Sequence, residues 1–371
     1  MRVLYWVEFF SPYIGGTQIV ASYLLPALRA RGHHIALITS SGSLGLAAVD
    51  EYAGMPLYRF PFQDVLADGR PEAILRLRRD VADRLSSFKP ELIHLALTGR
   101  SPLFLPGRAA LLSARVIVSM HFVIRDDLIA PDTVAHNVIE RAAWTAAISH
   151  GALEPVLRNV PGIADRSSVI YNGCPPPSLD PAPLPFAPPR MLCVGRLVHR
   201  KGFHHALNAL ALLLPRFPRV EMIIAGDGPD GPDLRRQAAA LGIDRQVTFT
   251  GWIAPERIFD LMNGVTAVLM PSLPEGLGNV AIQAALMSRP VIGSRVAGLT
   301  EIVVPDETGL LVEPENDEAL TAAMAWLIEH HADAIRMGET ARLRAADVFG
   351  WSKCVDAYAE LYERVGRADR N

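Results

Sequence analysis

Four glycine-containing loops hold most of the polar residues that are suited to chemistry, and each follows a short apolar run. One of them, residues 195–202, carries Arg196 and Lys201 and closes on a glycine. An arginine can grip two phosphate oxygens at once and a lysine adds a point charge, so this pair is suited to a phosphate or diphosphate. Taken alone, the same residues fit a solvated basic loop equally well.

An earlier loop contains Gly15 and Gly16 and opens an expected helix over residues 17–31. Glycines let the backbone approach a ligand closely, and a helix N-terminus offers free N–H groups to a phosphate. The G-x-G-x-x-G spacing is absent, so a dinucleotide site is not indicated. A plain tight turn explains these two glycines as well.

Two later loops also follow apolar runs. Gly226 and Asp227 form a turn where a base or ribose could lie against the backbone, although a turn alone has the same signature. Glu275 lies in a glycine-rich stretch, and a helix is expected to begin near Asn279, so that the amides of residues 277–280 can meet a phosphate. Gln283 lies one turn into that helix, with its side chain leaning back toward Glu275.

Short apolar runs alternate with amphipathic segments along the chain, which is typical of parallel sheets covered by helices on both faces. We expect strands at residues 3–7, 35–39, 91–95, 116–120, 146–149, 190–194, 220–225 and 247–250. Residues 201–217 and 233–241 are expected to be helices, and segments 258–262, 267–270, 280–288 and 290–293 continue the alternation. Pro26 is expected to kink the first helix.

A proline-rich segment divides the chain. Residues 174–190 contain eight prolines, which are incompatible with a regular helix or a central strand. The sequence therefore predicts an α/β protein with two doubly wound, Rossmann-like domains. The first spans residues 1–175, a linker spans 176–189, and the second spans 190–350. Ligands in such sheets bind at the carboxyl ends of strands, so a cleft between the domains is the expected site.

Composition excludes several classes of protein. The chain has 371 residues, a formal net charge of −3 and 20% charged residues, which gives no electrostatic reason to expect nucleic acid as a partner. Its three cysteines are far apart, so neither a disulfide framework nor a zinc site is indicated. No leader peptide and no apolar stretch of about 20 residues is recognisable. We expect a cytoplasmic protein, and peripheral attachment to a membrane is compatible with the sequence.

The order and spacing of many short motifs resemble glycosyltransferase family 4, the retaining group 1 enzymes of the GT-B fold. The resemblance covers nearly the whole chain. The matching motifs are Gly15-Gly16, Lys89-Pro-Glu-Leu-Ile-His94, Tyr171-Asn-Gly173, the loop from Gly195 to Gly202, Gly226-Asp-Gly-Pro229, Phe249-Thr-Gly-Trp252, the block from Pro271 to Asn279, Ala297-Gly-Leu-Thr-Glu301, the run from Asp306 to Val312, and Trp351, Tyr358 and Leu361-Tyr362.

The resemblance implies roles for individual residues. Arg196 and Lys201 match the residues that bind the donor diphosphate, and Gly15-Gly16 matches the loop that closes over it and the acceptor. Glu275 matches the first acid of the E-x7-E motif, which hydrogen-bonds sugar hydroxyls. His121 matches a residue beside the transferred sugar, although a structural histidine is the alternative. The remaining implied contacts to the base, ribose and phosphates are Gly226, Asp227, Trp252, Ile253, Gly276, Leu277, Gly278, Asn279 and Val280.

Gln283 is the main departure from the family pattern, because the family has a second acid there that accepts hydrogen bonds from the ribose. A carboxamide gives a neutral bond instead, which predicts a weaker ribose contact and about a fivefold lower donor affinity. Leu299 is a smaller departure, at a position where glycine is common. The terminal segment 351–371 is expected to return to the first domain.

The resemblance implies transfer of a hexose-type sugar from a UDP- or GDP-linked donor to a hydroxyl acceptor, in the synthesis of an envelope glycan, a glycolipid or a small glycoside. No cofactor and no metal are expected, because the Arg196 and Lys201 charges neutralise the diphosphate. Acceptor contacts are expected from the loops at residues 42–52 and 125–136. A nucleotide-sugar epimerase of the same fold and a donor-binding pseudoenzyme or regulatory subunit are the alternatives.

Overall fold

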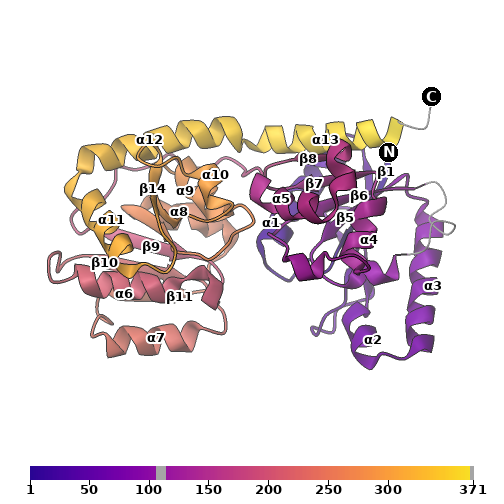
Figure 1. Ribbon diagram of the computed structural model, residues 1–371, viewed down its shortest axis with the longest axis horizontal. Helices are drawn as coiled ribbons and strands as arrows, with labels where there is room; N and C mark the ends of the chain where they lie inside the picture. Colours follow the sequence, from indigo (N-terminus) through magenta and orange to yellow (C-terminus); the bar gives the residue numbers. More distant parts are fainter. Residues whose placement is uncertain (106–113, 368–371) are drawn as a thin grey trace. The chain divides into compact units, whose positions relative to one another are not determined.

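The computed structural model of the chain describes residues 1–105 and 114–367 (Figure 1). The chain forms two compact units: unit 1 is Met1–Gly173 with Ser352–Asn371, and unit 2 is Cys174–Trp351. The last four positions of the expected terminal segment, 368–371, lie outside the described residues.

Unit 1 is built on an eight-stranded sheet with the order β3-β4-β2-β1-β5-β6-β7-β8. Its strands are β1 (Arg2–Val7), β2 (His34–Ser40), β3 (Val49–Tyr52), β4 (Met55–Phe60), β5 (Leu92–Leu97), β6 (Arg115–Met120), β7 (Trp144–Ala147) and β8 (Ser167–Val169). Neighbouring strands are parallel except β3, which pairs antiparallel with β4. The expectation of a loop over residues 42–52 was wrong for its last four residues, which form the exposed, polar edge strand β3 and lack apolar periodicity.

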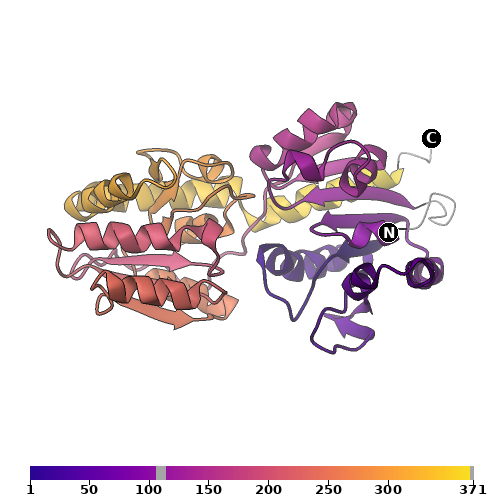
Figure 2. The ribbon, with the colours of Figure 1, turned by 60° about the horizontal axis from the view of Figure 1, so that its bottom comes forward.

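In the described residues of unit 1, six α-helices accompany this sheet: α1 (Gly16–Ala30), α2 (Phe62–Asp68), α3 (Pro71–Phe88), α4 (Val134–Arg141), α5 (His150–Asn159) and α13 (Trp351–Arg367). Pro26 lies inside α1. Helix α13 buries one stripe at helical spacing, including Val355, Tyr358 and Tyr362. Figure 2 shows α13, in yellow, beside the magenta strands of unit 1, although it lies at the other end of the sequence.

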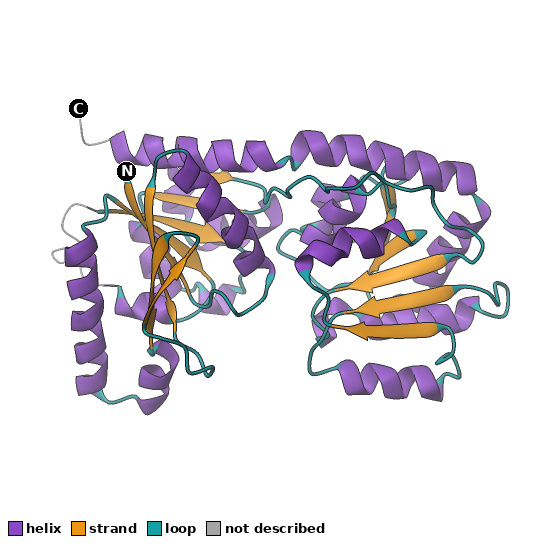
Figure 3. Cartoon of the chain, turned by 180° about the vertical axis from the view of Figure 1, so that it is seen from behind, coloured by secondary structure: helices purple, strands orange, loops and turns teal. Residues whose placement is uncertain are grey.

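Unit 2 has a six-stranded sheet with the order β11-β10-β9-β12-β13-β14, and every recorded pairing is parallel. The strands are β9 (Arg190–Val194), β10 (Glu221–Ala225), β11 (Val247–Gly251), β12 (Ala267–Met270), β13 (Val291–Ser294) and β14 (Gly309–Val312). In Figure 3 these strands are the orange arrows on the right, with helices on both faces of the sheet. In chain order the strands read 3-2-1-4-5-6, the doubly wound arrangement with its reversal between β9 and β12.

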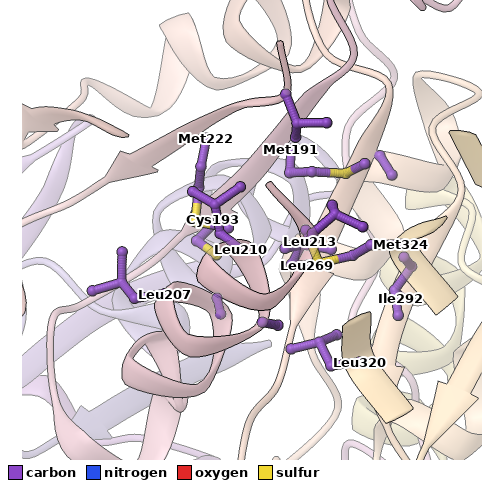
Figure 4. Close-up of a cluster of buried hydrophobic side chains, with 14 of the residues drawn as sticks. Met191, Cys193, Leu207, Leu210, Leu213, Met222, Leu269, Ile292, Leu320 and Met324 are labelled. Atoms are coloured by element: carbon purple, nitrogen blue, oxygen red, sulfur yellow. The ribbon is translucent and has the colours of Figure 1, made fainter. Parts of the chain in front are cut away.

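The helices of unit 2 are α6 (Phe203–Leu213), α7 (Gly231–Ala240), α8 (Ile258–Asn263), α9 (Asn279–Leu286), α10 (Leu299–Ile302), α11 (Asp317–Glu329) and α12 (His331–Val348). Helix α11 packs against α6, and α12 packs against α9. Met191 and Cys193, alternate residues of β9, point into a core with Leu207, Leu210 and Met324 (Figure 4).

The predicted strands at 91–95 and 146–149 are shifted to Leu92–Leu97 and Trp144–Ala147. The predicted helix over 201–217 is α6, Phe203–Leu213. It begins two residues later because Gly202 has φ 66°, a left-handed conformation, and it ends four residues earlier than predicted.

The proline-rich segment 176–189 is hydrogen-bonded to side chains of the rest of unit 2. The Arg289 guanidinium is buried and donates to the carbonyl of Ala182 over 2.8 Å, and the amide of Ala182 donates to Asn263 Oδ1 over 2.6 Å. The three cysteines are all free thiols. Among the described residues, no helix combines the length and apolarity that a membrane crossing requires.

Candidate active site

The reversal of strand order in unit 2 defines the place where a ligand is expected. In doubly wound sheets, ligands bind beyond the carboxyl ends of the two strands that flank such a reversal, which are β9 and β12 here. Residues 195–202 follow β9, and residues 271–278 follow β12. Two of the four loops singled out in the sequence therefore lie on neighbouring strands at this point.

The two loops are joined backbone to backbone. The amide of Leu273 donates to the carbonyl of Arg200 over 2.8 Å. A Cβ atom on Gly202 would lie 1.8 Å from the carbonyl oxygen of Pro271, so only glycine fits at that contact. This close approach fixes the position of the neighbouring Lys201.

Lys201 and Glu275 form an ion pair that connects the two loops. The Lys201 Nζ lies 2.5 Å from Glu275 Oε1, and the side chains are only 16% and 8% exposed. Because both charges are mostly removed from water, loss of either would leave the other uncompensated. The sequence predicted a role for each residue but not their direct contact.

Arg196 lies in the same loop as Lys201, and its side chain is exposed. Its backbone carbonyl accepts a hydrogen bond from Val198, and within the described chain its guanidinium makes no ion pair. Arg196 therefore presents a positive charge that can pair with a ligand at the carboxyl edge of the sheet. The neighbouring cation, Lys201, is already paired with Glu275.

Gly226 and Asp227 follow β10, next to the Arg196 loop. A Cβ on Gly226 would lie 1.9 Å from the carbonyl oxygen of Gly195, and the amide of Leu197 donates to the carbonyl of Asp227 over 2.9 Å. The glycine is thus required by the packing of two loops, a reason different from the ligand approach expected from sequence. The exposed Asp227 carboxylate accepts from the amide of Gly228 over 2.7 Å.

The stretch after Glu275 leads into helix α9. Gly276, Leu277 and Gly278 are buried, and Gly278 has φ 96° immediately before the helix begins at Asn279. Val280 and Gln283 are partly exposed on the first turns of α9. The expected geometry is present: a helix N-terminus follows the Glu275 loop directly.

Trp252 and Ile253 follow β11, at the edge of the sheet. Trp252 is 55% exposed, and Ile253 is partly exposed. In the sheet, β10 separates β11 from β9, so these residues lie two strands away from the Lys201 loop. An exposed indole in this position offers a flat apolar face for a base.

Gly15, Gly16 and His121 belong to unit 1. Gly15 is the N-cap of α1 and has an extended backbone with φ −170°, and α1 begins at Gly16. Gly15 therefore lies between β1 and α1, and Gly16 is the first residue of α1, so the loop opens the helix as the sequence predicts.

His121 follows strand β6 and takes part in a row of hydrogen bonds. Its Nε2 lies 2.8 Å from Ser119 Oγ, and Ser119 Oγ lies 2.9 Å from His94 Nε2. Burial lowers the pKa of His121 to about 4, so its imidazole is neutral near pH 7. The Nδ1 atom of His121 is buried and has no hydrogen-bond partner within the described residues.

Glu8 is a buried carboxylate that is not among the candidate site residues predicted from the sequence. It directly follows β1, at the point where the strand order of unit 1 reverses between β1 and β5. One carboxylate oxygen accepts from the amide of Ser101 over 2.8 Å, and a Cβ on Gly99 would lie 2.5 Å from the carboxyl carbon. The sequence feature that could have pointed to Glu8 is a charged residue immediately after a buried strand.

No group of three or more histidine, cysteine, aspartate and glutamate side chains within residues 1–105 and 114–367 is arranged to hold a metal ion.

Solved structures with this arrangement are glycosyltransferases. Sucrose-phosphate synthase from Thermosynechococcus elongatus matches with a TM-score of 0.83 and 23% identity, over 99% of this chain and 100% of that chain. HepE from Anabaena, in complex with UDP-glucose, matches with a TM-score of 0.79 and 22% identity, over 98% and 100% of the two chains. The fold is therefore that of the GT-B glycosyltransferases, a class of transferase enzymes.

Two family models identify the family within that class. Residues 14–176 match Glycosyltransferase Family 4, and residues 188–330 match Glycosyl transferases group 1. The chain belongs to this family of group 1, family 4 glycosyltransferases.

Curated relatives have diverse names. Glycogen synthase of Mycobacterium tuberculosis is 33% identical over 217 residues, which are 57% of this chain and 51% of the relative. Alpha-D-kanosaminyltransferase of Streptomyces kanamyceticus is 32% identical over 178 residues, 48% of this chain and 46% of the relative. The chain thus spans about half the length of these relatives.

Proposed function

We propose that this protein transfers a hexose-type sugar from a nucleotide diphosphate sugar to a hydroxyl acceptor, with retention of anomeric configuration. The observation that carries the proposal is the Lys201–Glu275 pair at the strand reversal of unit 2, with the exposed Arg196 beside it. A cation held in place by a carboxylate loses little side-chain freedom when a diphosphate arrives, which favours binding. UDP-linked donors are the first to test, because HepE, a relative in fold, was solved with UDP-glucose.

In this proposal, the loops of unit 2 bind the donor. Arg196 and Lys201 neutralise the charge that develops on the departing diphosphate, which is the main electrostatic task of the reaction. Glu275 has a second carboxylate oxygen besides the one paired to Lys201, and this oxygen accepts a hydrogen bond from a sugar hydroxyl. Trp252 and Ile253 contact the base, and Gln283 contacts the ribose.

The chemical step requires no nucleophile from the protein. The bond between the anomeric carbon and the diphosphate oxygen breaks, and the acceptor oxygen bonds to the same face of that carbon. The acceptor proton passes to the departing phosphate oxygen, so atoms and charge balance. With two cations of the chain at the diphosphate, the reaction proceeds without a metal ion.

Labelled UDP- and GDP-sugars incubated with the protein and a cell extract test the proposal. A labelled glycoside whose anomeric configuration matches the donor, as read by NMR coupling constants, is the expected product. An isomerised donor without a glycoside would contradict transfer and favour an epimerase, and binding with neither product would favour a pseudoenzyme.

A further inference from the structure

Four polar side chains form one continuous row of hydrogen bonds inside unit 1. The Tyr362 hydroxyl lies 2.6 Å from His94 Nδ1, His94 Nε2 lies 2.9 Å from Ser119 Oγ, and Ser119 Oγ lies 2.8 Å from His121 Nε2. Tyr362, His94 and Ser119 are 0–1% exposed, whereas His121 is partly exposed. The row therefore leads from the buried face of helix α13, through strands β5 and β6, to a partly exposed residue.

The members of the row carry no net charge near pH 7. Burial lowers the pKa of His94 to about 3, with a smaller contribution from His121, and burial raises that of Tyr362 well above its usual value. Each neutral imidazole has one nitrogen that donates and one that accepts. The Ser119 hydroxyl has one hydrogen, and its only side-chain partners within the described residues are His94 Nε2 and His121 Nε2, so this buried hydrogen is paired only if Ser119 donates to one imidazole and accepts from the other. With that condition, all hydrogen bonds along the row point in the same direction.

Only one direction leaves the Tyr362 hydroxyl hydrogen with a partner. If Tyr362 donates to His94 Nδ1, then His94 Nε2–H donates to Ser119 and the Ser119 hydroxyl donates to His121 Nε2. In the opposite direction, the buried Tyr362 hydroxyl hydrogen has no acceptor within the described residues, whereas the buried His121 Nδ1 lacks a partner there in either direction, so the Tyr362 hydroxyl decides between the two. Unmade hydrogen bonds of buried groups are costly, so the first direction is favoured.

The favoured direction determines which nitrogen of His121 carries the hydrogen. His121 Nε2 accepts from Ser119, so the hydrogen is on Nδ1, and this buried N–H has no partner in the described chain. An unpaired, neutral N–H at the end of a strand is suited to an uncharged oxygen acceptor such as a sugar hydroxyl.

We propose that Tyr362, His94 and Ser119 are positioning residues that hold His121 in its Nδ1–H form. The family resemblance implies that His121 lies beside the transferred sugar, so any consequence for transfer rests on the proposed function, whereas the form of His121 is a property of the protein without ligand. The C-terminal helix α13 thereby acts on a site residue that it does not contact directly.

Two tyrosines of α13 give a matched pair of variants. Tyr362→Phe removes the hydroxyl that begins the row. Tyr358→Phe removes a hydroxyl from an equally buried tyrosine, one turn away, whose ring stacks on His94 at 5.4 Å. A purely structural effect of losing a buried hydroxyl would affect both variants alike.

The test is NMR of the ligand-free protein labelled with ¹⁵N-histidine, with the His121 signals assigned by their loss in His121→Gln. We expect wild type and Tyr358→Phe to have a protonated Nδ1 and an unprotonated Nε2 at His121, and Tyr362→Phe to have a mixture of both forms. A protonated Nε2 in wild type, or identical spectra for the two variants, would overturn the proposal.

Transfer kinetics provide the second measurement. Loss of one hydrogen bond predicts that kcat/KM falls about fivefold in Tyr362→Phe relative to Tyr358→Phe. Equal kcat/KM values would overturn a consequence of the row for transfer. If wild type transfers no sugar, the proposed function fails, while the nitrogen shifts still decide whether the row sets the form of His121.

Discussion

The principal candidate site residues are charged in unit 2 and neutral in unit 1. In unit 2, Lys201 and Glu275 are an ion pair between two loops, with the exposed Arg196 next to it. In unit 1, His94, Ser119 and His121 form a buried neutral row. The charged pair is suited to a diphosphate, and the neutral row is suited to hydroxyl groups. The proposed donor chemistry therefore depends on fixed charge, whereas the proposed role of the row in unit 1 depends on the position of single hydrogen atoms.

The largest expected effect is on the charged side of this comparison. Lys201→Met removes one of two cations that stabilise the departing diphosphate, so the rate of sugar transfer should fall by about 10² to 10³-fold. The same change leaves Glu275 mostly buried and unpaired. Because the pair is partly accessible, we expect the free energy of unfolding to fall by about 2 kcal/mol, less than for a fully buried pair.

A double variant separates these two effects. Lys201→Met combined with Glu275→Gln removes both charges, so urea unfolding should recover most of the lost stability, because no buried charge is left unpaired. Transfer should stay as low as in the single variant. Recovery of transfer along with stability would mean that Lys201 has only a structural role.

The neutral row predicts a dependence of stability on pH. His94 and His121 have pKa values of about 3 and about 4 in the folded protein, against about 6.5 when unfolded. The unfolded chain therefore binds more protons than the folded one between about pH 6.5 and pH 4. In this window the free energy of unfolding should fall as pH falls, by about 1.4 kcal/mol per pH unit for each histidine.

Urea unfolding at pH 7.5, 6.0 and 5.0 measures this slope. His94→Gln should make it shallower, whereas His34→Gln, a change at an exposed residue of β2, is the matched control. If His94→Gln and wild type lose stability equally as the pH is lowered, the row does not hold a neutral imidazole at position 94.

The smallest expected effect concerns the ribose contact. Gln283→Glu introduces the carboxylate that the family pattern has at this position, and a charge-assisted hydrogen bond should raise nucleotide affinity about fivefold. Gln246→Glu adds the same charge at the amino end of β11, on the opposite edge of the sheet, and should leave affinity unchanged. Calorimetric titration distinguishes the two variants, and equal affinities would exclude a ribose contact at position 283.

The sequence was sufficient for the fold class and for the position of the unit 2 loops that carry the candidate site residues, for a physical reason, whereas the roles of these residues stay predictions. Arg196, Lys201 and Glu275 lie in glycine-rich loops directly after buried strands, so strand prediction and loop composition locate them together. The resemblance to family 4 gave the same residues. The Lys201–Glu275 contact was not predictable, because it depends on how two loops 74 residues apart approach each other.

The row in unit 1 could not be derived from sequence. His94, Ser119 and Tyr362 lie on buried strands and on a helix far along the chain, and no local pattern distinguishes them from core residues. Edge strand β3 was missed because its polar, exposed residues lack apolar alternation. Both misses involve residues whose role is set by tertiary neighbours and not by local spacing.

Calorimetric titration of UDP, GDP and ADP into wild type, Arg196→Ala and Arg219→Ala tests the central claim most directly. Arg196 follows β9 and Arg219 precedes β10, so the two variants remove the same exposed charge from opposite edges of the sheet. We predict that at least one nucleotide binds wild type and Arg219→Ala equally, and that Arg196→Ala binds it at least tenfold more weakly. Unchanged affinity in Arg196→Ala would contradict a diphosphate site at the strand reversal of unit 2.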